Sequence, residues 1–132
     1  MRFKRILVII GISVPVVFIC SLLAIHIWIG LDVRKNINIA KQKYPGTAEE
    51  ALISFLQDEN NSYHDRTHIA IWTLGQIKSG KALPLLKSYY KNDPKGLTCY
   101  RKHNSVLCQY ELHKAIVQIE SKWVFTHPRL RD

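Results

Sequence analysis

The first part of the chain is hydrophobic and free of charge over a long stretch. From Ile6 to Gly30 there is no Asp, Glu, Lys or Arg, and a short basic tip, residues 1–5, comes directly before it. At about 1.5 Å per helical residue the run reaches on the order of 37 Å, enough to cross a hydrocarbon core of roughly 30 Å with some tilt. Pro15 is compatible with this, because spanning helices tolerate proline. The pattern predicts a single transmembrane anchor over residues 1–30.

A cleaved signal peptide is the alternative interpretation of this segment, since signal peptides also begin with a basic tip and an apolar run. The run is, however, longer than the roughly 7 to 15 residues of a signal h-region, and residues 24–27 offer no pair of small residues for cleavage. We therefore expect an uncleaved anchor.

The charges that flank the apolar run bear on its orientation. Arg2, Lys4 and Arg5 lie immediately beside it, and a short basic N-terminus before a first apolar segment usually stays in the cytoplasm. The other end is also basic, with positive charges at Arg34, Lys35, Lys41 and Lys43, so the count nearly balances. Proximity favours a cytoplasmic N-terminus, with the following domain outside the cytoplasm, in a bacterium the periplasm. The four basic residues after the span are expected to lie near anionic lipid headgroups.

A helical period replaces the uninterrupted run after Gly30. Val33, Ile37, Ala40 and Tyr44 recur on one stripe, and the basic residues lie mostly off it. This predicts an amphipathic juxtamembrane helix or linker over residues 31–46, ended by Pro45-Gly46. The stripe is expected to pack against the domain or a partner helix.

Four further helices are predicted in the remaining chain. Thr47 and Glu50 have capping-box spacing before an apolar-periodic run, which indicates a helix start. Later helices are expected over about 62–78, closed by Ser79-Gly80, and over about 81–91 and 104–123, with a tail at 124–132. No alternating strand pattern competes with these helices. The predicted fold class is all-α, with a transmembrane helix followed by a small antiparallel helical-hairpin domain at 47–123.

The length and the charge of the chain limit the functions that it is expected to have. The chain has 132 residues, so about a hundred follow the span, enough for one small domain. All ten acidic residues and sixteen of the nineteen basic residues lie after Gly30, which gives this part a positive excess of six. There is no recognised nucleic-acid motif that interleaves aromatic and basic residues, so a nucleic-acid partner is not expected.

Two cysteines, Cys99 and Cys108, lie close together beyond the span. An even pair suits a disulfide in an oxidising compartment, where a loop of about ten residues would contribute roughly 2.5 to 3 kcal/mol. Two free thiols in a reducing cytosol are the alternative. A zinc site is disfavoured because the pair and the nearby His103 and His113 lack the usual ligand spacing.

The residues that could carry out catalysis lie in one segment of the chain. His64 and His68 lie at i and i+4 on one predicted helix, as zinc ligands do in metalloproteases, which makes a metal-dependent hydrolase one alternative function. Asp65 stands where such motifs have Glu, and no third ligand is evident. No nucleophile motif or Gly-rich phosphate loop occurs in the sequence. We therefore expect no enzyme, no metal and no cofactor.

Aromatic residues are numerous for such thin helices, and most are expected in the core. A remaining apolar patch with a basic rim would form a protein-binding face, because Trp and Tyr are favoured at interfaces. The aromatic residues beyond the span that could contribute are Trp72, Tyr89, Tyr90, Tyr100, Tyr110, Trp123 and Phe125. The candidate interface residues are Trp72, Tyr89, Tyr90 and Trp123.

The stretch 52–93 contains a series of residues at recurring helical positions: Leu56, Asp58, Asp65-Arg66, Ala70, Thr73-Leu74-Gly75, Ile77, Gly80 and Ala82-Leu83-Pro84-Leu85-Leu86. Through these residues it resembles a HEAT repeat of the short bacterial type, and Ala115, Ile116 and Ile119 of the last helix resemble the start of another repeat more weakly. It implies one full repeat with flanking half repeats, in which Asp65 and Arg66 cap and bridge neighbouring helices and Gly75 permits close helix approach. Fewer than about three repeats is below the usual minimum for a solenoid, so other parts of the chain or a partner must complete the core.

Together these features predict a membrane-tethered protein-binding adaptor or scaffold at the outer face of a bacterial inner membrane, with a membrane or periplasmic protein as partner. The alternative is an accessory subunit of a larger membrane complex.

Overall fold

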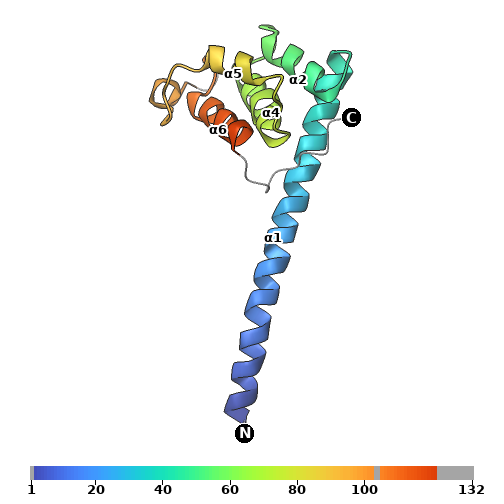
Figure 1. The fold of residues 1–132 in the computed structure, drawn as a ribbon, viewed down its shortest axis with the longest axis vertical. Coiled ribbons are helices and arrows are strands. Elements are labelled where there is room, and N and C mark those ends of the chain that lie inside the picture. Colours follow the sequence, from blue (N-terminus) through green and yellow to red (C-terminus); the bar gives the residue numbers. More distant parts are fainter. Residues whose placement is uncertain (1, 103–104, 122–132) are drawn as a thin grey trace. The chain divides into compact units, whose positions relative to one another are not determined.

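The computed structural model describes residues 2–102 and 105–121, and the side chains of residues 13–102 and 105–121. The chain forms two compact units, Met1–Asp32 and Val33–Asp132. Throughout the described residues the regular structure is helical and no strand occurs. The predicted all-α fold class, a long apolar helix followed by shorter helices, is confirmed. Figure 1 shows the order of the helices along the chain.

The first unit is formed by the N-terminal part of helix α1 (Arg2–Lys43). Pro15 lies inside this helix without ending it. From Ser13 onward α1 is long and apolar enough to cross a membrane, and its large apolar side chains, such as Phe18 and Leu23, are exposed. A signal sequence near an N-terminus also meets these two criteria of length and hydropathy.

The second unit begins with the last turns of α1. Of the predicted stripe, Val33, Ile37 and Ala40 are buried in it and Tyr44 is half-buried. The segment 31–46 therefore contributes side chains to the core of the unit as well as connecting the two units. The chain leaves α1 through a turn in which Gly46 has φ +116°, a conformation that glycine adopts without strain.

Helix α2 (Ala48–Gln57) starts where the capping box predicts. The Glu50 backbone N–H donates to Thr47 Oγ1 (3.3 Å), and the Thr47 N–H donates to Glu50 Oε2 (3.0 Å). These reciprocal bonds satisfy two backbone donors that the helix leaves unpaired. Its buried residues are Ala48, Ala51, Leu52, Phe55 and Leu56.

The central helical stretch consists of α3 (Tyr63–Asp65), η1 (Arg66–Ile71) and α4 (Trp72–Gln76). The middle part, η1, is a π-helix, a rare conformation that widens the helix by one residue per turn. The stretch ends in a left-handed residue, Lys78 (φ 51°), and the Ser79 N–H then donates to Leu74 O (3.0 Å). The predicted helix is confirmed, but its cap is formed at Lys78 and not by Gly80.

The C-terminal part of the unit holds α5 (Leu83–Tyr89), a short 3-10 turn η2 (Leu97–Cys99) and α6 (Gln109–Glu120). Helix α6 begins about five residues later than the sequence pattern suggests, so Val106 and Leu107 belong to the preceding connection. Asn104, Lys122 and Trp123 of the predicted last helix lie outside the described residues, as do His103 and the predicted tail, 124–132.

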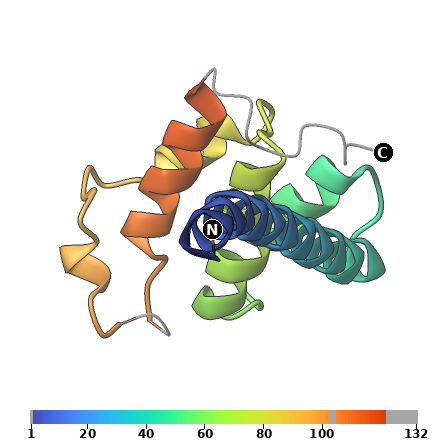
Figure 2. The same cartoon turned by 90° about the horizontal axis from the view of Figure 1, so that it is seen from below.

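Helix α4 is the centre of the second unit. It packs against α6 on one side and α2 on the other, and α5 packs against α6 (Figures 1 and 2). At Gly75 an added Cβ would lie 3.0 Å from both Cα and Cβ of Ala115 on α6. The core therefore lies between α2, the central stretch and α6, and the connection between α5 and α6 runs along its edge.

Candidate functional site

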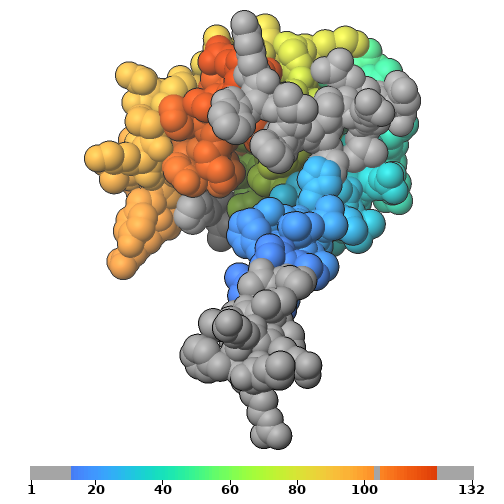
Figure 3. Space-filling view, turned by 60° about the horizontal axis from the view of Figure 1, so that its bottom comes forward, coloured from blue at the N-terminus to red at the C-terminus, as the bar shows by residue number. Residues whose placement is uncertain are grey.

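Among the described residues of the second unit, the most exposed apolar side chains lie on the connection between α5 and α6. Leu97 is 72% exposed and Tyr100 66%, while Tyr110, in the first turn of α6, is 47% exposed. Figure 3 shows this connection in orange at the surface beside α6. We define the loop face as the exposed apolar residues Leu97, Tyr100, Val106 and Tyr110 together with the exposed basic residues Lys91, Lys95, Arg101 and Lys102.

Local hydrogen bonds give this connection a defined shape although it has little regular structure. The Asp93 carboxylate accepts from the hydroxyl and N–H of Thr98 (2.7 and 2.8 Å) and from the N–H of Leu97 (3.0 Å). These bonds from Thr98 and then Leu97 hold the pKa of Asp93 below its ordinary value. Gly96 adopts φ +65°, and a Cβ there would lie 2.9 Å from the Tyr110 Cβ. The turn is therefore fixed against the start of α6.

Cations lie over two of the exposed aromatic rings. The Arg101 guanidinium is 5.3 Å from the centre of the Tyr100 ring, and Lys114 Nζ is 5.1 Å from that of Tyr110. Such pairs orient both groups at the surface. The loop face thus combines aromatic residues with a positive rim, a composition common among residues that dominate protein interfaces.

A first hollow, the histidine hollow, has a volume of about 440 Å³ and opens beside the loop face. The His64 and His68 rings lie 4.4 Å apart within it, so the helical spacing does bring the two imidazoles together. Across the parts of the chain that the structure describes, no three His, Cys, Asp or Glu side chains are grouped to share a metal ion. The lining residues are His64, His68, Lys95, Gly96, Cys99, Tyr100, Cys108, Tyr110 and Glu111.

A second hollow, the arginine hollow, has a volume of about 450 Å³. Arg66, which is almost fully buried, donates from Nε to Leu56 O (2.7 Å), and its guanidinium lies 5.5 Å from the Tyr63 ring and 5.9 Å from the Tyr89 ring. Arg66 therefore bridges the central stretch to α2, whereas the Asp65 carboxylate lies near His64 Nδ1 (3.4 Å). The lining residues are Glu59, Tyr63, Arg66, Tyr89, Lys91, Thr98, Val106, Leu107 and Gln109.

Three of the four aromatic residues predicted to form the interface lie in the part of the chain that the structure describes. Trp72, Tyr89 and Tyr90 are each half-buried, and of these Tyr89 lines the arginine hollow. The Tyr90 ring stacks on His113 with ring centres 5.7 Å apart, and its hydroxyl lies 3.2 Å from His113 Nδ1. Tyr90 thus makes internal contacts between α5 and α6. Trp123 lies outside the described residues.

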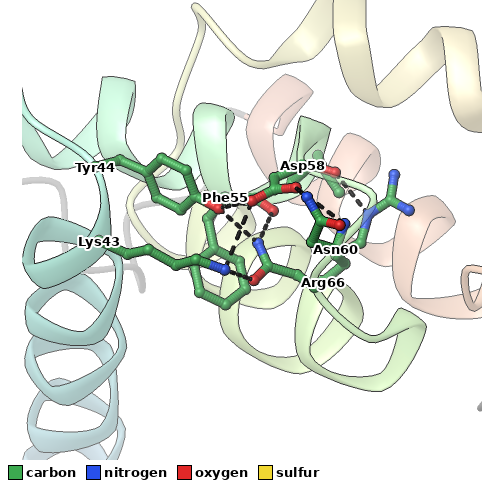
Figure 4. A network of polar contacts seen from close by, with 8 residues as sticks. Lys43, Tyr44, Phe55, Asp58, Asn60 and Arg66 are labelled. Carbon is green, nitrogen blue, oxygen red and sulfur yellow. Dashed lines mark hydrogen bonds and ion pairs between the residues drawn. The ribbon is translucent and has the colours of Figure 1, made fainter.

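The end of α1 is held to α2 and the following turn by a polar network (Figure 4). Lys43 Nζ donates to Asn61 Oδ1 (2.5 Å) and pairs with Asp58 (3.6 Å), and the Tyr44 hydroxyl donates to Asp58. The bond from Tyr44 and then those from Asn60 lower the pKa of Asp58 to about 2. The ammonium group of Lys43 is therefore bonded within this network. The other three basic residues predicted at the membrane surface, Arg34, Lys35 and Lys41, are exposed.

Comparison of the chain with protein-family models, with curated proteins and with solved structures finds no match. The resemblance to a HEAT repeat is thus supported only by the residues quoted for it, among them Ala70 and Leu74, both fully buried.

Sequence reasoning missed the loop face as a site. The turn residues Asn92 to Gly96 identify a loop, but nothing in their pattern says that the loop presents Leu97 and Tyr100 to solvent. The available signal was compositional, since apolar residues in a connection with four basic residues are unusual for a solvated loop.

Proposed function

We propose that the chain is a membrane-tethered protein-binding module that acts at the outer face of a bacterial inner membrane. The observation that carries the proposal is the loop face, because monomeric soluble domains rarely gather exposed apolar side chains on one connection without a binding role. Loops held by a rigid scaffold are common binding elements, and here the scaffold is the packed pair of α4 and α6.

The chemistry of the loop face indicates its partner. Lys91, Lys95, Arg101 and Lys102 are exposed on the same connection as Leu97, Tyr100 and Val106, and the carboxylate of Asp93 accepts a hydrogen bond from Thr98. A complementary surface would be acidic with an apolar centre. We therefore expect a protein partner with an acidic, partly apolar patch, located in or near the same membrane.

The long apolar helix would supply the tether. Confinement to a membrane raises the local concentration of a binding module toward a partner in that membrane. The exposed basic side chains of Arg34, Lys35 and Lys41 would then lie near anionic headgroups, each worth about 1 kcal/mol of attraction. The N-terminal basic tip favours a cytoplasmic N-terminus.

Site-specific photo-crosslinking in intact membranes tests this proposal. A photoreactive residue at Tyr100 or Tyr110 should give one and the same crosslinked protein, whereas a probe at Lys87, exposed on α5, should not. Identical products from all three positions, or none from Tyr100 and Tyr110, would contradict a binding role for the loop face. Recovery of several proteins in fixed proportion with the uncrosslinked chain would instead favour an accessory subunit of a larger complex.

Orientation needs a separate measurement. A reporter that is active only outside the cytoplasm, fused after Asp132, should be active, and one that is active only in the cytoplasm should be silent. The reverse pattern would overturn the proposed location of the domain without affecting the crosslinking result.

A further inference from the structure

Two buried sulfur atoms lie in contact at the base of the loop face. Cys99 Sγ and Cys108 Sγ are 3.4 Å apart, and the two residues are 1% and 6% exposed. A disulfide needs a sulfur separation of about 2.05 Å, so the gap to be closed is on the order of 1.3 Å, within reach of small side-chain rotations. Cys20, the third cysteine, lies in the other compact unit.

We propose that Cys99 and Cys108 form a disulfide-forming pair, oxidised to an intrachain disulfide by thiol–disulfide exchange with a small-molecule or protein disulfide. Cys108 is the more exposed of the two, and both residues line the histidine hollow, so an incoming disulfide can approach from that side. Burial raises the pKa of the Cys108 thiol, which slows this first step but does not prevent it.

The exchange proceeds in two balanced steps. The Cys108 thiolate attacks one sulfur of the external disulfide, which forms a mixed disulfide and releases one thiolate. The Cys99 thiolate then attacks the Cys108 sulfur and releases the second thiolate. Two thiols of the protein are oxidised, one external disulfide is reduced to two thiols, and the protons from Cys99 and Cys108 pass to the released thiolates.

The surroundings of Cys99 favour the second step. Its sulfur accepts a hydrogen bond from the Gln109 N–H (3.3 Å), at the first residue of the 12-residue helix α6. A backbone donor at a helix N-terminus stabilises negative charge on an attacking sulfur. The Cys108 N–H in turn donates to Thr67 Oγ1 (3.3 Å), which holds Cys108, the residue attacked in the second step, against η1.

The bond would fix the loop face to the helical core. The segment from Lys91 to Thr98 is held by hydrogen bonds within the turn at Asp93 and by hydrogen bonds of Gln109 with Tyr89 and Lys91. A covalent link at Cys99 adds a permanent attachment directly before Tyr100. We therefore expect oxidation to set the position of Tyr100 relative to Tyr110, and thereby the wall of the histidine hollow that these residues share.

Thiol counting on the full-length chain tests the pair. In a Cys20→Ser background, cells are quenched in acid and the denatured chain is labelled with a maleimide of high mass. We expect no label before reduction and two labels after it, and a Cys99→Ser variant should carry one label without reduction. Two labels before reduction would mean that the pair is reduced in the cell.

A second measurement tests whether the pair can form a disulfide independently of the redox conditions in the cell. The same chain, purified reduced in detergent, is treated with oxidised glutathione. We expect loss of two hydrogen masses, no retained glutathione, and a melting temperature about 10 °C above that of the reduced form. A stable glutathione adduct or a disulfide-linked dimer would overturn the pair itself. If the pair is reduced in cells but forms the disulfide in vitro, its oxidation in the cell and the proposed location of the domain are overturned, while the pair itself stands. The crosslinking result at Tyr100 does not depend on either measurement.

Discussion

Gly75 of α4 faces Ala115 of α6 at a distance that leaves little room for a side chain. A Cβ on Gly75 would lie 3.0 Å from the Cα and Cβ of Ala115, and one of these is backbone that cannot rotate away. A larger residue at position 75 would therefore require the two helices to shift by a few tenths of an ångström. The relationship fixes the separation of the helices that support the loop face.

Replacement of Gly75 by alanine should force α4 and α6 apart. We expect Gly75→Ala to lower the free energy of unfolding by about 1–3 kcal/mol through overpacking. Gly80→Ala is the matched control, because a Cβ at Gly80 meets nothing within 4 Å, and its effect should stay within about 0.5 kcal/mol. Urea unfolding of the full-length chain in mild detergent measures both. Equal effects at the two positions would contradict the proposed tight contact.

The network at the end of α1 predicts a pH dependence. The pKa of Asp58 is lowered from 3.8 to about 2, chiefly by the hydrogen bond from Tyr44. A carboxyl group with a depressed pKa contributes stability that is fully present above 3.8 and is lost as the pH falls toward 2. Tyr44→Phe should raise the pKa of Asp58 toward 3.8 and remove part of this stability at neutral pH.

Carboxyl-carbon NMR titration of Asp58 checks this prediction. Tyr63→Phe is the control, since it also removes one tyrosine hydroxyl but leaves the network of Asp58 unchanged. A pKa of Asp58 that is the same in Tyr44→Phe and in the unaltered chain would exclude Tyr44 as the main cause of the shift.

Arg66 should resist replacement by lysine. It is buried, donates to Leu56 O and lies between two tyrosine rings, and lysine lacks the planar guanidinium needed for both contacts. We expect Arg66→Lys to destabilise the chain by about 1–3 kcal/mol, because it weakens a charged hydrogen bond to a buried carbonyl. Arg101→Lys, at an exposed position, should change the free energy of unfolding by less than about 0.5 kcal/mol. Similar losses for both, by urea unfolding, would argue against the bridging role of Arg66.

The sequence predicts much of this helical framework because its signals are local. The Thr47–Glu50 capping box marks the start of α2, and the stripe Val33, Ile37 and Ala40 is buried. The left-handed residue at Lys78 could not be predicted, because a lysine pays a steric cost there that only the tertiary packing offsets. The conformational propensities of the residues alone predict the left-handed conformation at Gly80.

The candidate site was less predictable than the framework. The local sequence does not distinguish Tyr90 from Tyr100, yet the Tyr90 ring stacks on His113 while Tyr100 is exposed. Tyr100 lies in the connection before α6, where Gly96 comes close to Cys99 and Tyr110, residues 3 and 14 positions away in the chain. Long-range contacts of this kind are not encoded in a local pattern of apolar residues.

The long apolar helix should lose its membrane attachment when charge is placed in its middle. Each lysine at the centre of a span costs about 2.5–3.5 kcal/mol in insertion, so the double variant Ile19→Lys and Leu22→Lys should shift the chain out of the membrane fraction. Leu31→Lys is the control, because a lysine at the edge of the apolar stretch can extend its ammonium group to the membrane interface. Extraction with alkaline carbonate separates integral from released protein. Retention of the double variant would count against a spanning helix.

The loop face should determine affinity for the protein that crosslinks at Tyr100. Truncation of a central aromatic residue in an interface costs about 2 kcal/mol, so Tyr100→Ala should weaken binding roughly 30-fold, while Tyr100→Phe keeps the ring and should change it little. Arg101→Ala removes a cation that lies over this ring and should weaken binding less, by an amount that shrinks as salt screens the charge. Lys87→Ala, an exposed charge on α5, should have no effect at any salt concentration. Equal losses for Arg101→Ala and Lys87→Ala, measured by titration calorimetry, would mean that net charge and not the loop face governs the interaction.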